Sequence, residues 1–125
     1  MRFFPIAFML FISQIGAQPD VDGIHQSLKN NNLQILCSGF DDHVEMDLPL
    51  SQGKYSSQQA CAQIAQFLSK ESIKKVVSLH TGTARDKGAF YSIGKIMTNN
   101  KEFRLYIYYR KKESSYLIKE IRIEA

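Results

Sequence analysis

The feature of this sequence that most limits its fold is a change in the pattern of apolar residues near Lys75. From there to residue 124 the pattern is typical of β-strands. Four segments rich in Val, Ile, Tyr, Phe and Thr, which favour strands, follow one another at residues 75–81, 89–98, 103–110 and 116–124. The links between them, residues 82–88, 99–102 and 111–115, are short enough for antiparallel hairpins. The pattern predicts a four-stranded meander, and Gly94 inside its second strand predicts that the sheet curls.

Helical spacing dominates the chain before that point. After the acidic Asp20, three apolar residues recur at helical intervals: Val21, Ile24 and Leu28. The asparagines at residues 30–32 end this first helix. A second short stripe has Asn32 as its N-cap and Gly39 near its end, and its apolar members are Leu33, Leu36, Cys37 and Phe40. Two short helices are therefore expected before any strand.

A strand and a longer helix are expected between these elements and the meander. Residues 41–48 alternate strictly, with Val44, Met46 and Leu48 on one side, and Pro49 ends the run. Ser56 and Gln59 then fit a capping box, so a helix should begin there. The buried stripe of that helix is Ala60, Cys61, Ile64, Phe67 and Leu68.

The meander should pack one face against these helices. Its third strand offers an apolar face of Phe103, Leu105, Ile107 and Tyr109, and its fourth offers Leu117, Ile121 and Ile123, interrupted by Lys119. The expected fold is α+β, with N-terminal helices packed in the concave face of a curled, mainly antiparallel sheet.

This order of elements resembles the cone-shaped, cystatin-like fold of the nuclear transport factor 2-like superfamily. Several short segments are also similar to a family of short exported Bacteroidetes proteins that is known only as a domain of unknown function: residues 55–60, 80–82, 91–94, 103–107 and 121–124. The resemblance covers nearly all of the chain after residue 17 and implies the fold. It implies no activity, because superfamily relatives include isomerases, dehydratases, ligand binders and interaction domains.

The N-terminus predicts export. Arg2 precedes an apolar run that is too short to span a bilayer, and the small residues Gly16 and Ala17 offer a cleavage point. We expect a signal peptide at residues 1–17 and a single domain at residues 18–125, periplasmic or secreted; the alternative is an uncleaved anchor. The residue directly after the cleavage point is Gln18 and not a cysteine that could carry a lipid, so no membrane attachment is expected after cleavage.

Cys37 and Cys61 are the only cysteines of the chain. An exported chain with an even number of cysteines is permitted a disulfide, so these two are a candidate pair. Both also lie on predicted apolar stripes and could equally be buried thiols. The sequence leaves the two alternatives open.

Aromatic residues expected to face the helices outnumber paired acid and base groups, which favours a binding site over a catalytic one. We predict an exported, non-catalytic binding or interaction module with a small apolar pocket, lined by Phe40, Phe67, Tyr91 and Tyr109, with His80 as a polar contact. The alternative is an isomerase-like or lyase-like enzyme with His80 as general base. No carboxylate lies two positions from His80 to orient it, so we assign no catalytic residue.

The outer face of the meander suggests partners. Tyr106 and Tyr108 lie with Arg104 and Arg110 on the polar side of one strand, which suits a homodimer or another protein. The net charge of the chain is +4 and falls to +3 without Arg2. Because the lysines and arginines are scattered along the chain, we expect no binding to nucleic acid. His43, Glu45 and Asp47 read as the wet face of a strand and not as metal ligands, and neither a metal nor a cofactor is expected.

Overall fold

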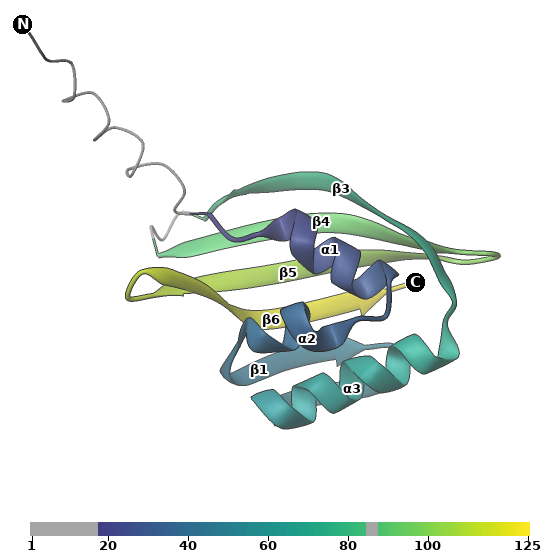
Figure 1. The fold of residues 1–125 in the computed structure, drawn as a ribbon, viewed down its shortest axis with the longest axis horizontal. Helices are drawn as coiled ribbons and strands as arrows, with labels where there is room; N and C mark the ends of the chain where they lie inside the picture. The colour runs from purple at the N-terminus through teal and green to yellow at the C-terminus, as the bar shows by residue number, and fades with distance from the viewer. Residues whose placement is uncertain (1–17, 85–87) are drawn as a thin grey trace, which may run out of the picture.

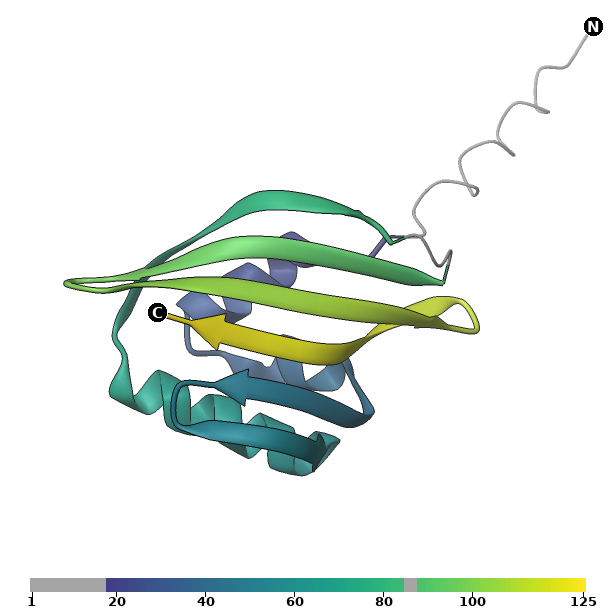
Figure 2. The same ribbon diagram turned by 180° about the vertical axis from the view of Figure 1, so that it is seen from behind.

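A computed structural model describes residues 18–84 and 88–125 as three helices packed on one face of a curved six-stranded sheet (Figures 1 and 2). The predicted signal peptide, residues 1–17, lies outside the described residues. The predicted α+β fold with N-terminal helices in the concave face of a mainly antiparallel sheet is confirmed.

The helices begin where the sequence predicts. They are α1 (Val21–Lys29), α2 (Leu33–Ser38) and α3 (Ser57–Lys70). The side chains of Asp20 and Asn32 accept hydrogen bonds from the first turns of α1 and α2. At α3 both halves of the predicted capping box form, since the Ser56 hydroxyl accepts from the Gln59 amide and the Gln59 side chain accepts from the Ser56 amide.

The strands are β1 (Phe40–Leu48), β2 (Ser51–Ser56), β3 (Ile73–Thr83), β4 (Ala89–Thr98), β5 (Glu102–Lys112) and β6 (Ser115–Glu124). Their order in the sheet is β2-β1-β6-β5-β4-β3, and only β1 and β6 pair in parallel. The four C-terminal strands form the predicted meander, and β1 adds to its far side.

The strand β2 was not predicted. It contains Gly53 and mainly polar residues, so no apolar alternation marks it in the sequence. It forms because Pro49 and Leu50 turn the chain back, which pairs Leu48 with Ser51 and Val44 with Tyr55. Backbone hydrogen bonds to β1 therefore hold an edge strand that has almost no buried side.

The predicted inner face of β6 is confirmed at Ile121 and Ile123 but was wrong at Leu117, before Lys119. Glu120 pairs with Tyr108 but Ile118 pairs with Tyr109, so Lys119 is an extra residue in a β-bulge. The bulge turns Ile118 inward, where only 1% of its surface is exposed, and leaves Leu117 half-buried on the other face. The interruption at Lys119 in the sequence is thus the bulge itself.

The bulge also brings a lysine to a buried carboxylate. Asp41 is 3% exposed, and its oxygens lie 2.7 Å from Lys112 Nζ and 3.7 Å from Lys119 Nζ. Burial alone would raise the pKa of Asp41, but the hydrogen bond from Lys112 and the charges of both lysines hold it below the usual range. The start of β1 is in this way tied to the β5–β6 hairpin.

The core lies between the helices and the concave face of the sheet. Ile64 of α3, Val44 of β1 and Ile96 of β4 are fully buried there, together with the predicted face of β5, which is Phe103, Leu105, Ile107 and Tyr109. Side chains therefore fill the part of the cone at which the sequence predicts a pocket.

Candidate functional site

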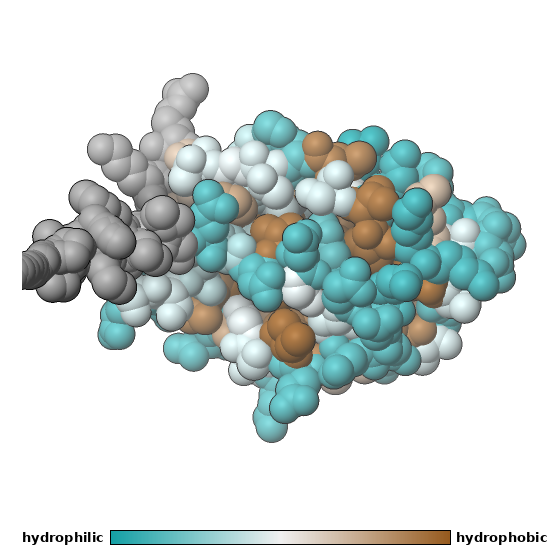
Figure 3. Space-filling model, turned by 45° about the horizontal axis from the view of Figure 1, so that its top comes forward, coloured by the Kyte–Doolittle hydropathy of each residue, from teal (hydrophilic) through white to brown (hydrophobic). Residues whose placement is uncertain are grey.

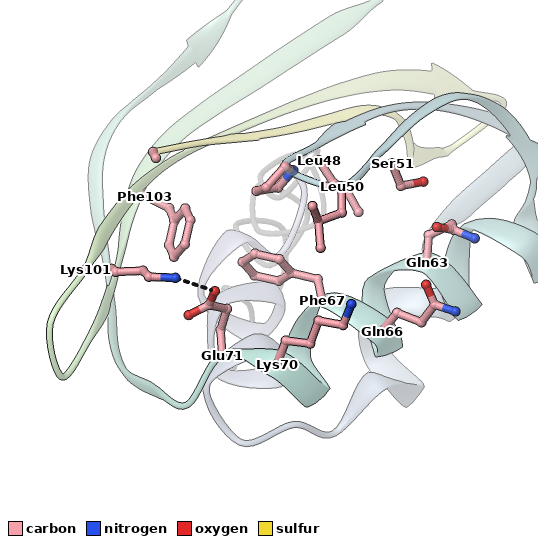
Figure 4. A pocket seen from close by; sticks show the side chains of 12 residues that line it. Leu48, Leu50, Ser51, Gln63, Gln66, Phe67, Lys70, Glu71, Lys101 and Phe103 are labelled. Atoms are coloured by element: carbon pink, nitrogen blue, oxygen red, sulfur yellow. Dashed lines mark hydrogen bonds and ion pairs between the residues drawn. The ribbon is translucent and has the colours of Figure 1, made fainter.

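A pocket of about 310 Å³ opens where the end of α3 faces the β1–β2 turn and the start of β5 (Figure 4). Its apolar base is formed by Leu48, Phe67 and Phe103, whose two phenyl rings meet edge to face with centroids 5.4 Å apart. Such a volume is at the lower end of the range for small-molecule sites. The pocket has room for on the order of ten non-hydrogen atoms, at ~30 Å³ for each water-sized volume.

Polar side chains from α3 and from the β4–β5 turn form the rim of the pocket. Lys101 Nζ lies 3.2 Å from Glu71 Oε2, which closes one side with an ion pair. Gln63, Gln66 and Lys70 line the α3 side, and Lys70 makes no salt bridge to any described residue. The rim therefore offers amide donors and acceptors and one ammonium group that has no carboxylate partner in the described part of the chain.

Leu50 is the exposed large hydrophobic residue among those that line this pocket. It lies in the turn between β1 and β2, lines the pocket, and has 79% of its surface exposed. Two-residue hairpin turns favour Asn, Asp and Gly, so turn geometry does not account for a leucine at this position. The Leu50 side chain therefore lies at the opening of an apolar pocket and is exposed to solvent.

Only one of the predicted ligand-binding residues lines this pocket. Phe67 does so, whereas Phe40 and Tyr109 are core residues, 7% and 1% exposed, elsewhere under the helices. The sequence analysis missed Leu48, Leu50 and Phe103 as pocket residues. The leucine after Pro49 was the one available signal, because an apolar residue is unusual in a tight turn.

His80 and Tyr91 lie on the outer face of the sheet, away from the helices. The register of β3 shifts after Ser78, which pairs with Gly94, because His80 pairs with the next residue, Ile93. Leu79 is thus an extra residue in a bulge, and the bulge turns His80 to the face opposite Ser78. Strict alternation along the strand would place His80 on the same face as Ser78, and the sequence does not reveal the extra residue that reverses it.

On that outer face His80 contacts Tyr91 directly. His80 Nε2 and the Tyr91 hydroxyl are 3.0 Å apart, and both groups are accessible to solvent. Gly82 on β3 leaves room for the ring, because a Cβ there would lie 3.1 Å from the Tyr91 hydroxyl. Neither residue lines the apolar pocket. The position of His80 therefore does not support the hypothesis that it is a general base.

Tyrosines and charges alternate over the rest of the outer face. Tyr91 pairs across the sheet with Tyr108, and the Arg122 guanidinium lies 5.3 Å from the centre of the Tyr106 ring. Arg122 also reaches carboxylate oxygens of Glu120 and Glu124 at 3.5 and 3.6 Å. Figure 3 shows the other side of the molecule, from the helices with the β3 edge turned forward, where the hydrophobic residues of the described ranges form small groups among hydrophilic ones.

Three buried polar atoms have no hydrogen-bond partner in the described part of the chain: His25 Nε2 on α1, Ser92 Oγ on β4 and Tyr109 Oη on β5. Burial raises the pKa of Tyr109 to about 12, and the nearby Ser92 hydroxyl opposes this rise. Burial also lowers the pKa of His25, although Asp22 acts in the opposite direction. Burial therefore favours the neutral form of the His25 ring inside the fold.

The two cysteines lie on neighbouring helices and are bonded. Cys37 of α2 and Cys61 of α3 form a disulfide with their Cα atoms 5.5 Å apart. The two helices pack against each other over the core, so the bond closes a contact that the fold already makes. The disulfide lies away from the pocket and serves as a structural link.

The described residues offer no site for a metal ion, since no three of their His, Cys, Asp and Glu side chains gather closely enough. His43 and Glu45 are exposed on β1, as expected for the wet face of a strand. Residues 18–84 and 88–125 also contain no helix with the length and hydropathy to cross a membrane.

Solved structures of similar proteins have the same fold. A DUF4783 family protein from Bacteroides uniformis ATCC 8492 is 27% identical, with a TM-score of 0.76 over 85% of this chain and 96% of that one. A DUF4783 family protein from Bacteroides ovatus ATCC 8483 is 25% identical, with a TM-score of 0.76 over 86% and 94% of the two chains. An NTF2-like protein of unknown function from Cytophaga hutchinsonii ATCC 33406 is 15% identical, with a TM-score of 0.59 over 88% and 89%, and shows the fold alone.

No curated protein matches the chain. The family model described as Domain of unknown function (DUF4783) matches residues 21–124, which is nearly the whole of the described chain. Together with the NTF2-like fold, this match shows that the chain belongs to the DUF4783 family of domains of unknown function.

Proposed function

We propose that this protein is a non-catalytic binding module that holds a small apolar group, carried by a free ligand or by another chain, in the pocket between α3 and the β1–β2 turn. The observation that carries the proposal is the apolar base of Leu48, Phe67 and Phe103, which opens to solvent beside Leu50. Small-ligand sites commonly combine such a base with a few polar groups at the rim. Here Gln63, Gln66 and Lys70 provide those groups.

The chemistry of the pocket favours binding over catalysis. A hydrolytic, isomerase or lyase site needs an acid or base within reach of the bound group. The rim carboxylate, Glu71, is already paired with Lys101, and none of the described histidines lines the pocket. The pocket is thus better suited to bind a group by burying its apolar surface than to catalyse a reaction.

We also propose that the module acts after export, in the periplasm or outside the cell, with Gln18 as its first residue. The disulfide between Cys37 and Cys61 supports this location, because disulfides persist in oxidising compartments. N-terminal sequencing of protein recovered from the native host would test it. Intact Met1 on membrane-bound protein would contradict the proposal.

The binding proposal is tested with octan-1-ol, a neutral probe of about the right size for the pocket. Titration of ¹⁵N-labelled protein should give saturable shifts of backbone amide signals that are largest at Leu48, Leu50, Phe67 and Phe103. Leu50→Gln should weaken binding about three- to tenfold, since it removes apolar contact at the opening. Shifts that do not saturate, or that centre on another surface, would refute the proposal.

Leu79→Gln is the matched control for that titration. Leu79 is also an exposed leucine, 48% exposed, but it lies in the β3 bulge and does not line the pocket. This variant should bind octan-1-ol as the wild type does. An equal loss in both variants would point to non-specific hydrophobic adsorption.

A further inference from the structure

The surface around the pocket contains both an apolar projection and an apolar recess. We call it the Leu50 patch and define it as the pocket base with Leu50, Gln63, Gln66, Lys70 and Glu71. Because the exposed leucine and the recess lie side by side, two copies of the patch related by a twofold axis can each place Leu50 over the other's recess. We propose that a second copy of this chain is the partner that occupies the pocket.

This inference rests on the proposed function, because it names the apolar group as Leu50 of a second copy. The position of Leu50 supports it first. Leu50 follows Pro49 in a tight turn that joins two paired strands, so the backbone that carries this leucine is fixed before any partner arrives. A preorganised apolar side chain loses less conformational entropy on binding than a mobile one.

The polar rim supports a second copy in the same way. Glutamine side chains both donate and accept hydrogen bonds, so Gln63 and Gln66 can pair with the same residues of a symmetric copy. Lys70 makes no salt bridge to a described residue, and Glu71 lies next to it in sequence at the end of α3. Glu71 uses Oε2 for its ion pair with Lys101, so its other oxygen can accept from Lys70 of the second copy across a twofold axis.

The patch is small, since it comprises the β1–β2 turn, one side of α3 from Gln63 onward, and the adjoining ends of β1 and β5. Interfaces of this size lie below the area of stable dimers, which is about 1,200 Å² or more in total. The dimer is therefore expected to be weak, with a dissociation constant on the order of 100 μM. It also differs from a dimer through the outer sheet face, where Tyr106 and Tyr108 lie.

Sedimentation equilibrium tests the proposal directly, with the purified chain at concentrations from about 10 μM to about 1 mM. The wild type should pass from monomer to dimer within this range. Leu50→Asp should raise the dissociation constant at least about tenfold, because it places a charge in the apolar recess of the partner. Octan-1-ol at saturation should dissociate the wild-type dimer, because both occupy the same recess.

Two control variants separate this surface from the alternatives. Leu79→Asp changes an exposed leucine outside the patch, and Tyr108→Ser changes the outer sheet face. Both should dimerise as the wild type does. A dimer that Tyr108→Ser disrupts and Leu50→Asp leaves intact would overturn the proposal.

Charge reversal gives a second, independent readout of the rim contact. Lys70→Glu should weaken the dimer about two- to fivefold, and Lys70→Gln, which removes the charge without reversing it, should weaken it less. A wild type that stays monomeric at about 1 mM while it still binds octan-1-ol would end this inference and leave the proposed function standing. A dimer through Leu50 without any octan-1-ol binding would instead end the proposal of a small-ligand pocket.

Discussion

The His25 ring of α1 packs against Gly94 of β4, where a side chain on the strand would crowd the ring and collide with the Val77 carbonyl oxygen of β3. A Cβ built on Gly94 would lie 3.3 Å from His25 Cε1 and 2.8 Å from the Val77 carbonyl oxygen on β3. Gly94 therefore does more than let the sheet curve. It leaves the space in which a buried histidine joins the first helix to the sheet.

Gly94→Ala should destabilise the protein by about 1–3 kcal/mol, because the Val77 backbone oxygen must move to accept a methyl group. Urea unfolding monitored by circular dichroism measures the change. Gly39→Ala is the matched control, since its Cβ would meet no atom nearer than 3.5 Å and its backbone φ is −93°. An unchanged midpoint for Gly94→Ala would show that the strand relaxes without cost.

The stability of the protein should fall as the pH drops below about 6.5, the ordinary pKa of histidine. Burial lowers the pKa of His25 in the folded state, so the unfolded chain binds a proton that the folded protein excludes. The contribution is constant above the unfolded pKa and is lost progressively as pH falls toward the folded pKa. Urea midpoints measured between pH 7.5 and 5 avoid the range in which Asp41 gains its proton.

His25→Gln should flatten that pH dependence, because glutamine does not titrate. His80→Gln, which changes an exposed histidine on the outer face, should keep the wild-type slope. If the two variants and the wild type lose stability in parallel, His25 does not set the acid response.

Removal of the disulfide should cost about 3 kcal/mol in the double variant Cys37→Ala, Cys61→Ala, on a model in which the bond restricts the unfolded chain over its 24-residue separation. Wild-type protein treated with a reducing agent should unfold at a urea concentration similar to that of the double variant. Thiol titration of unfolded, unreduced protein gives the covalent state directly. Two free thiols in that protein would contradict the bond.

Tyr109→Phe should leave stability nearly unchanged or raise it by up to about 1 kcal/mol, because it removes a buried hydroxyl that makes no full hydrogen bond within the described residues. Tyr109→Ala should cost about 3–5 kcal/mol, since the ring is 1% exposed and packs against Phe90. Thermal unfolding of the two variants separates the ring from its hydroxyl. A large loss in Tyr109→Phe would reveal a partner for the hydroxyl.

The sequence by itself determined the elements whose signals are local. The Ser56 capping box, the Asn32 cap and the alternation of β1 and β5 each depend on residues a few positions apart, so each was readable before the fold was known. The order of helices and strands then limited the architecture, because a meander with one apolar face must pack against the helices that precede it.

The tertiary structure alone decided which way the later side chains point. The bulges at Leu79 and Lys119 arise from how neighbouring strands pair, and each one reverses the faces of the residues beyond it. This is why His80 lies outside the cone and Ile118 inside it. The periodicity of one strand does not reveal an extra residue, because a bulge is defined only by how that strand pairs with its neighbour.

The pocket was equally beyond the reach of the sequence. Its base joins Leu48 at the end of β1, Phe67 on α3 and Phe103 at the start of β5, which come together only when β1 pairs with β6 beside the meander. Local pattern determines that these residues are apolar. Whether such residues fill a core or surround a recess depends on how closely the elements approach in space, and packing of the whole chain sets that approach.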